Sequence, residues 1–230
     1  MTAAAAAMLG EACWPEVRAS TVLVPLGSVE QHGPHLPLDT DTRIATAVAT
    51  RVAARHPGAT VVAPPVAYGA SGEHEGFPGT ISIGSAALRL LLVELVRSAT
   101  RTFSRVVLVC GHGGNIDGVA AALSRLRYER RDVVGWFGAV SAGDAHAGRT
   151  ETSLLLAIAP GLVRPGPWQA GATAPIDRLM PALRTAGVRQ ISPNGVLGDP
   201  AGATPAEGER LLDLLAVRLA ELLPLPRQPA

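Results

Sequence analysis

The stretch TVLVPLGSVEQHGPHLPLDTD, residues 21 to 41, decides the fold. It begins with a continuous apolar run, as expected for a strand buried on both faces, and it continues into acids and histidines. Three later runs repeat this pattern: TVVAPPV at 60 to 66, RVVLVCG at 105 to 111 and DVVGWFG at 132 to 138. These four runs predict the strands of one buried sheet.

Helical periodicity separates the predicted strands. Ile44, Val48 and Val52 recur every four residues after the first strand. Similar stripes cover 88 to 95 and 116 to 123. Such regular returns of apolar side chains are typical of helices that cover a sheet. The alternation predicts an α/β fold with a mostly parallel central sheet.

The C-terminal third is less regular. Thr204, Pro205 and Glu207 form a capping-box pattern with proline at the first helical position, which predicts a helix through LLDLLAVRLAELL. The Gly- and Pro-rich segment 160 to 203 has a helical pattern only near 176 to 183. We expect this segment to cover the functional site or an oligomer interface, and the LPRQPA end to be frayed.

Composition limits the classes of function. The chain has 230 residues, the size of one domain over 1–230, with twenty basic and nineteen acidic residues and no strong cluster of either sign. This balance favours a small or neutral substrate and predicts no nucleic-acid or membrane partner. All the basic residues are arginine, so mechanisms that need a lysine side chain are excluded. Two cysteines and an alanine-rich start without basic residues predict a cytoplasmic protein.

Histidines gather after the predicted strands. Five of the six lie in GSVEQHGPHLPLDTD, YGASGEHEGFPGT, GHGGN and GDAHAGRTE, and only His56 lies elsewhere. Ligands of open α/β sheets bind beyond the carboxyl ends of the strands. We therefore expect the functional site at this edge of the sheet.

The first of these segments predicts a divalent metal site. Glu30 and His32 are two residues apart, so in an extended backbone both side chains project to the same side. Asp41 follows at the start of a helix, where its two oxygens could bridge two cations or could cap the helix, a task open also to Asp39 or Thr40. Nitrogen and carboxylate ligands together suit zinc, iron or manganese.

The GHGGN segment allows two interpretations. His112 follows the third strand, where the glycines permit a sharp turn and a close approach to a ligand. His112 is therefore a candidate metal ligand. The same segment could be a phosphate-binding nest at a helix N-terminus, capped by Asn115. That alternative leaves the acids and histidines of the first segment unexplained.

His146 and Glu151 are further candidates, five residues apart at the start of a helix. Their alternatives are a surface histidine and an acid at a positive helix end. His35 could be a spectator or could replace His32 as ligand. The run Glu73, His74 and Glu75 is expected to be a solvated loop tip.

Four ordered motifs, ExHGPHLPLDTD, GHGGN, HAGxxETS and GDPxxATxxxG, resemble those of the creatininase-like family over residues 21 to about 220. The resemblance implies a three-layer α/β sandwich and a homo-oligomer. It also implies a metal-dependent amide hydrolase with Glu30, His32, Asp41 as bridge and His112 as ligands.

One departure from creatininase concerns the second metal. Creatininase has a Tyr-Glu pair after the histidine of the third-strand motif, and this glutamate binds the second metal. Gly113 and Gly114 occupy these positions here, which argues against creatinine as substrate. Glu151 is the nearest candidate to replace the lost ligand. The short length and the GEHEGFPGTIS segment look more like the family branch found with mycofactocin biosynthesis, whose members release the modified C-terminal Val-Tyr dipeptide from a precursor peptide.

The expected reaction is hydrolysis of an amide or peptide bond with one or two divalent metals per chain. A bound cation lowers the pKa of water from about 15.7 to about 7. His146 is predicted to donate a proton to the leaving amine, and Glu151 to bind the second metal or carry protons. Gly113 and Gly114 amides could hold the oxyanion, and Ser71 could contact substrate. Hydrolysis of a small cyclic or formyl amide, and phosphate or nucleotide binding without catalysis, stay as alternatives.

Overall fold

Four parallel strands form the central sheet of the computed structural model, which describes residues 8–138, 140 and 143–223. The strands are β1 (Thr21–Leu26), β2 (Thr60–Val62), β3 (Arg105–Cys110) and β4 (Val133–Phe137), in the order β2-β1-β3-β4. Every residue of β1 is buried, as its continuous apolar run predicts. All three strand pairs run parallel.

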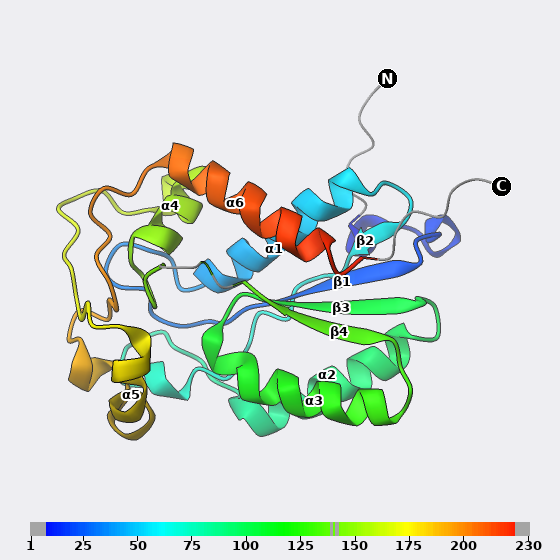
Figure 1. The fold of residues 1–230 in the computed structure, drawn as a ribbon, viewed down its shortest axis with the longest axis horizontal. Coiled ribbons are helices and arrows are strands. Elements are labelled where there is room, and N and C mark those ends of the chain that lie inside the picture. Colours follow the sequence, from blue (N-terminus) through cyan, green and yellow to red (C-terminus); the bar gives the residue numbers. More distant parts are fainter. Residues whose placement is uncertain (1–7, 139, 141–142, 224–230) are drawn as a thin grey trace.

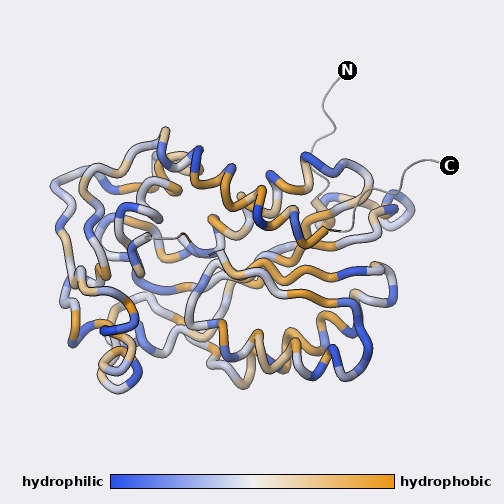
Figure 2. Tube along the Cα trace, viewed as in Figure 1, coloured by the Kyte–Doolittle hydropathy of each residue, from blue (hydrophilic) through white to orange (hydrophobic). Residues whose placement is uncertain are grey.

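Helices cover both faces of the sheet (Figure 1). One layer consists of α1 (Thr40–Arg55), α4 (Arg149–Ile158) and α6 (Pro205–Ala220), and the other of α2 (Gly84–Ala99) and α3 (Ile116–Tyr128). In Figure 2 the strands and the helix faces turned toward them are the most hydrophobic parts of the trace. Burying a Val or Leu side chain contributes about 1.5–3 kcal/mol, so these two apolar layers hold the sandwich together. The predicted three-layer α/β fold is confirmed.

The second strand is shorter than predicted. It ends at Val62, although the apolar run continues to Val66. Pro64 and Pro65 interrupt the run, because proline has no N–H to donate to a neighbouring strand. Only Val66 returns to β1, where it forms an isolated bridge with Leu26.

The segment after α4 lies beside the carboxyl edge of the sheet, where α5 (Ile176–Ile191) packs against the short turn η3 (Gly72–His74). Gly187 interrupts α5 with a φ of 70°. The hydroxyl of Thr204 accepts a hydrogen bond from the Glu207 backbone at the start of α6, as the capping pattern predicts. The carboxylate of Glu207 bonds instead to Arg149 and Ser153, so only half of the predicted capping box forms.

The remaining short turns are 3-10 helices: η1 (Leu9–Glu11), η2 (Trp14–Glu16), η4 (Gly113–Asn115) and η5 (Pro160–Leu162). The alanine-rich start and the LPRQPA end, about which the sequence made predictions, lie outside the described residues. Within the described ranges, no helix combines the length and the hydrophobicity needed to cross a lipid bilayer.

Candidate metal centre

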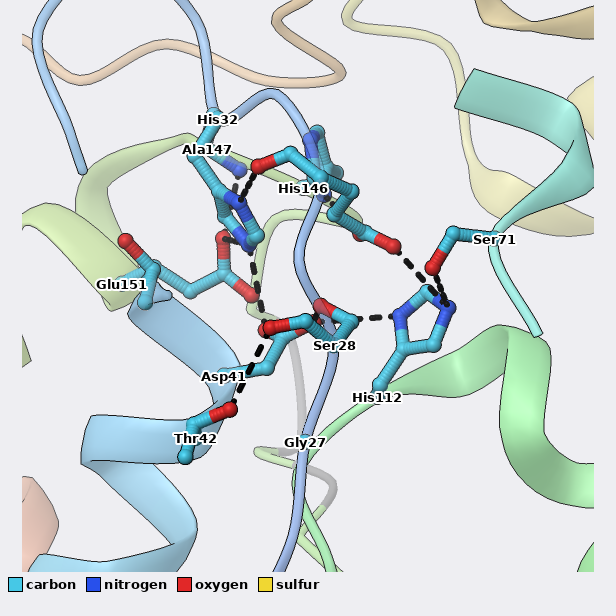
Figure 3. A network of polar contacts seen from close by, with 12 residues as sticks. Gly27, Ser28, His32, Asp41, Thr42, Ser71, His112, His146, Ala147 and Glu151 are labelled. Carbon is cyan, nitrogen blue, oxygen red and sulfur yellow. Dashed lines mark hydrogen bonds and ion pairs between the residues drawn. The ribbon is translucent and has the colours of Figure 1, made fainter. Parts of the chain in front are cut away.

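Side chains from four separate segments converge at the carboxyl edge of the sheet (Figure 3). These segments are the loop after β1 with the first turn of α1, the turn η3, the loop after β3, and the loop before α4 with the first turn of that helix. The acids and histidines that meet there are Glu30, His32, Asp41, His74, His112, His146 and Glu151, and all but the partly buried Glu151 are buried. So many buried titratable groups are costly unless they are paired or bind a cation.

Glu30 lies at the centre of this group. Its side chain is fully buried, and neither carboxylate oxygen has a hydrogen-bond partner among the described residues. Its nearest nitrogens are His112 Nε2 at 3.1 Å from Oε2 and His74 Nε2 at 3.4 Å from Oε1. Burial raises the pKa of Glu30 to about 7, although the nearby His112 opposes this shift. An orphaned buried carboxylate among imidazoles fits a site for a divalent cation.

His32 presents one ring nitrogen to the acids. Its Nδ1 lies 3.1 Å from the backbone oxygen of Glu30, and its Nε2 lies 3.1 Å from Asp41 Oδ1. Burial alone would lower the pKa of His32, but Asp41 and Glu151 raise it to about 10. A histidine whose far nitrogen is held by a backbone carbonyl is the usual arrangement of a metal ligand.

Asp41 lies in the first turn of α1 and faces two histidines. Its Oδ1 contacts His32, and its Oδ2 lies 3.1 Å from His112 Nδ1. Although burial opposes it, the contacts with His32 and His112 hold the pKa of Asp41 well below its usual range. Asp39 is the N-cap residue of α1, and its side chain makes no capping hydrogen bond. The side chain of Asp41 is therefore committed to the cluster and not to the helix end.

The second glycine after His112, Gly114, allows close packing around the histidine ring. A Cβ on Gly114 would lie 2.3 Å from Ala70 O, 2.5 Å from Glu73 Oε1 and 2.5 Å from His112 Nε2. His112 Nε2 lies 3.0 Å from Ala70 O, which leaves Nδ1 toward Asp41. Although burial lowers the pKa of His112, Glu30 and Asp41 raise it to about 10.

The GHGGN turn does not match a phosphate nest. Asn115 is the N-cap residue of α3 but makes no side-chain capping bond. Its amide instead accepts a hydrogen bond from Ala70 N and donates one to Gly27 O, which ties three loops together. The carboxylates of Glu30 and Asp41 beside His112 would also repel a phosphate.

Glu151 and His146 complete the other side of the cluster. Glu151 Oε2 accepts a hydrogen bond from Ala147 N over 2.6 Å and lies 3.9 Å from His32 Nε2. Burial raises the pKa of Glu151 to about 7. His146 Nδ1 lies 3.8 Å from Glu30 Oε1. Burial and the nearby His32 and His74 hold the pKa of His146 well below its usual range.

Two residues that the sequence assigned to a solvated loop tip belong to this site. His74 is buried and contacts Glu30, and Glu73 lies 3.8 Å from His112 Nε2, whereas Glu75 is exposed. Burial lowers the pKa of His74 to about 3. The clustering of histidines after the strands was the signal that pointed to His74.

His35 has the surroundings of a spectator, and Ser71 lies beside His112. His35 lies outside the cluster, where its Nε2 is 2.9 Å from Thr152 Oγ1 and its ring packs near Trp168. Ser71 is fully buried, with Oγ 3.4 Å from His112 Nε2. The geometry therefore favours a role for Ser71 in supporting His112 over direct contact with substrate.

Cys110 ends β3 below His112. Its thiol is buried and donates to the backbone oxygen of His112 over 3.2 Å. Burial raises the pKa of this thiol to about 12.

A cavity of about 1310 Å³ opens onto the cluster. Residues of the centre in its wall are Asp41, Glu73, His74, His112, Gly113, Gly114, His146 and Glu151. Helix α5 forms another part of the wall. The segment 160 to 203 was expected to cover either the functional site or an oligomer interface, and its helix α5 borders the site. Three overlapping groups have ligand atoms close enough to hold an ion: Glu30, His74 and His146; His32, His146 and Glu151; and Glu30, His32 and Asp41.

The family model of creatinine amidohydrolases matches residues 10–223. The chain belongs to the creatininase family. The resemblance read from the sequence motifs is thus confirmed, and so is the prediction of a metal-dependent hydrolase acting on C–N bonds.

Two curated relatives are mycofactocin precursor peptide peptidases. The one from Mycolicibacterium smegmatis is 61% identical over 83% of this chain and 78% of its own length. That from Mycobacterium ulcerans is 52% identical over 93% of this chain and 88% of its own length. A solved creatinine amidohydrolase superimposes with a TM-score of 0.73 at 29% identity, and the match covers 93% of this chain and 95% of that one. Other solved creatininases include a Zn–Zn form and a manganese form.

Proposed function

We propose that this chain is a peptidase that releases the C-terminal Val-Tyr dipeptide from a modified mycofactocin precursor peptide. The identity of 61% with a mycofactocin precursor peptide peptidase is the observation that carries this proposal. The cavity of about 1310 Å³ supports it, because such a volume accommodates a peptide end and exceeds the need of a small cyclic amide. We further propose that the peptidase acts in the cytoplasm as a homo-oligomer and as a single domain.

The proposed centre holds one or two divalent ions. Glu30, Asp41 and His112 would hold the first, and His32, Asp41 and Glu151 would contribute to the second, with Asp41 shared. Zinc, iron and manganese all accept this set of nitrogen and oxygen ligands. When bound, the ion lowers the pKa of water and polarises the scissile carbonyl.

The protein groups around the cavity would perform the remaining tasks. Gly113 and Gly114 lie in its wall, where their N–H groups could hold the developing oxyanion. Glu151 is fixed through Oε2 by Ala147 N and has its pKa raised to about 7. As the alternative to binding the second ion, a carboxyl with such a pKa can accept and return a proton near neutral pH.

Mass spectrometry of the precursor peptide tests the proposal. The purified protein should release the dipeptide, chelation should abolish release, and zinc, iron or manganese should restore it. Asp41→Ala should lose most of both metals and most of the activity, whereas full metal content in this variant would exclude the bridging role. Turnover of creatinine or a formyl amide, with no cleavage of the precursor, would overturn the proposed substrate.

A further inference from the structure

The side chain of Gln31 makes hydrogen bonds in a fixed orientation. Its Oε1 accepts from Gly33 N over 2.8 Å, and its Nε2 donates to Gly195 O over 3.0 Å. Exchanging the two atoms would place the amide nitrogen against Gly33 N and the amide oxygen against Gly195 O. Two donors would then face each other, and so would two acceptors. Gly33 and Gly195 have φ values of 64° and 80°, and a Cβ on Gly195 would lie 1.9 Å from Gln31 Oε1. Backbone hydrogen bonds with two glycines therefore fix both polar atoms of this amide.

The fixed amide determines which nitrogen of His74 carries hydrogen. Gln31 Nε2 lies 2.9 Å from His74 Nδ1, so Nδ1 must accept this hydrogen bond. A neutral His74 then has its hydrogen on Nε2, which faces Glu30 Oε1 at 3.4 Å. With its hydrogen on this nitrogen, His74 offers the acids an N–H and no free lone pair.

His146 has the opposite relation to the acids. Its Nε2 lies 2.8 Å from the backbone oxygen of Gln31 and 3.0 Å from Gln31 Nε2. The two amide hydrogens of Gln31 serve His74 Nδ1 and Gly195 O, so the hydrogen-bond count is complete only when His146 Nε2 donates to the Gln31 oxygen. His146 Nδ1 is then unprotonated.

The unprotonated Nδ1 of His146 faces a carboxylate with no hydrogen between them. Glu30 Oε1 lies 3.8 Å away, and the N–H turned toward it comes from His74 Nε2 at 3.4 Å and not from His146. Two buried acceptors turned toward each other indicate a cation between or beside them. His32 shows the same pattern, with Nδ1 at the backbone oxygen of Glu30 and Nε2 toward Asp41.

We propose that Gln31 fixes the tautomers of two histidines, so that His146 binds metal through Nδ1 whereas His74 acts as a hydrogen-bond donor through Nε2. Distance alone does not separate the two residues, because both belong to a group able to hold an ion. His146 would join His32 and Glu151 and supply the ligand that Gly114 lacks. This assignment replaces the proton-donor role predicted for His146 from the sequence.

Nitrogen-15 NMR of the metal-free full-length protein tests the tautomers without metal or substrate. Both His146 and His74 should carry hydrogen on Nε2, with signals assigned from His146→Ala and His74→Ala. Gln31→Glu keeps the shape of the side chain but removes the N–H donor. It should move the hydrogen of His74 to Nδ1 and leave His146 unchanged, because His146 bonds to the backbone of residue 31. Hydrogen on Nδ1 of His146 in the wild-type protein would overturn the proposal.

Zinc titration gives the second readout. His146→Ala should bind the more weakly held Zn²⁺ at least tenfold less tightly, whereas His35→Ala, the matched control at a similarly buried position outside the cluster, should stay within about twofold of wild type. Equal zinc binding by wild type and His146→Ala would overturn the proposal, as would an equal loss of zinc affinity in His146→Ala and His35→Ala. The inference rests on the proposed function only in taking the cluster as a metal centre. Failure to cleave the precursor would leave both readouts intact.

Discussion

Ser28 donates a hydrogen bond from Oγ to Oδ2 of Asp41 over 2.8 Å. The same oxygen faces His112 Nδ1, so the serine fixes the direction in which the carboxylate points. Partners of this kind, which contact a ligand and not the metal, orient the ligand and tune its basicity.

Ser28→Ala should therefore weaken metal binding by about 10- to 100-fold and leave the fold intact. Competition with a chromogenic chelator measures this affinity. Ser20→Ala is the control, because the Ser20 hydroxyl is exposed and bonds only to Ala59 O. Equal affinities in the two variants would show that Ser28 does not support the bridge.

Gly113 and Gly114 should differ sharply in their tolerance of a side chain. A Cβ on Gly113 meets nothing within 4 Å, whereas a Cβ on Gly114 would clash with Ala70, Glu73 and His112. Gly114→Ala should displace His112 and lower kcat/KM by roughly 10²-fold, because misplacement by about 1 Å can cost that much. Gly113→Ala keeps its N–H and should stay within a few-fold of wild type. Similar kinetics for the two variants would contradict the packing described for Gly114.

The metal-free protein should become less stable as the pH rises above 7. Burial raises the pKa of Glu30 from 4.5 to about 7, so the folded state holds a proton that the unfolded state releases in this range. Burial opposes the shift at His32, but Asp41 raises its pKa from 6.5 to about 10. Stabilisation from His32 is full below pH 6.5 and is lost as the pH approaches 10. Both groups thus make the free energy of unfolding fall with rising pH.

Thermal unfolding between pH 7 and 9 measures this dependence, because below pH 7 the lowered pKa values of His35, His74 and His146 act in the opposite direction. The Tm of the metal-free protein should fall from pH 7 to 9, whereas the metal-loaded protein should gain stability relative to it, because the cation displaces these protons. Glu30→Gln lacks the Glu30 contribution, so between pH 5 and 7 its Tm should rise relative to that of the wild type. A Tm of the metal-free protein that rises from pH 7 to 9 would contradict the assigned shifts.

Under the proposed function, Arg184 should bind the carboxylate at the end of the peptide. It lines the cavity and has no hydrogen bond or ion pair with the described residues, whereas Arg189 in the same wall contacts Gly76 O and the Phe77 ring. Arg184→Gln should raise KM roughly tenfold for a free-acid peptide but not for its C-terminal amide. Arg178→Gln, also on α5 but outside the cavity wall, is the control. An equal effect on acid and amide would exclude this role.

The strands and the first loop were predictable because local patterns determine them. The apolar runs of β1 and β3 give their burial directly, and the two-residue spacing of Glu30 and His32 places both side chains in the site. Position at the carboxyl edge then brings His112 to the same place. No long-range information is needed for these steps beyond the parallel order of the strands.

The roles of Gln31 and His74 could not be predicted in this way. Gln31 contacts Gly195, 164 residues away, and His74 becomes buried because α5 and the first loop close over its turn. Sequence shows neither contact, and a short polar turn is usually exposed. Asp41 was ambiguous for a related reason: a helix start suits both a cap and a ligand, and only the positions of His32 and His112 distinguish them.

The buried thiol of Cys110 bears on which ions can occupy the centre and on how the protein responds to oxidants. Its Sγ is turned toward the backbone oxygen of His112 and, with a pKa near 12, the thiol stays protonated in the metal-free protein. The ligand groups of the described residues offer nitrogen and oxygen, whereas soft ions such as Cu(I) select sulfur. The same protonation makes the thiol a poor target for peroxide and for alkylating reagents. A burst of oxidant should therefore reach any redox-active ion in this centre before it reaches the sulfur below.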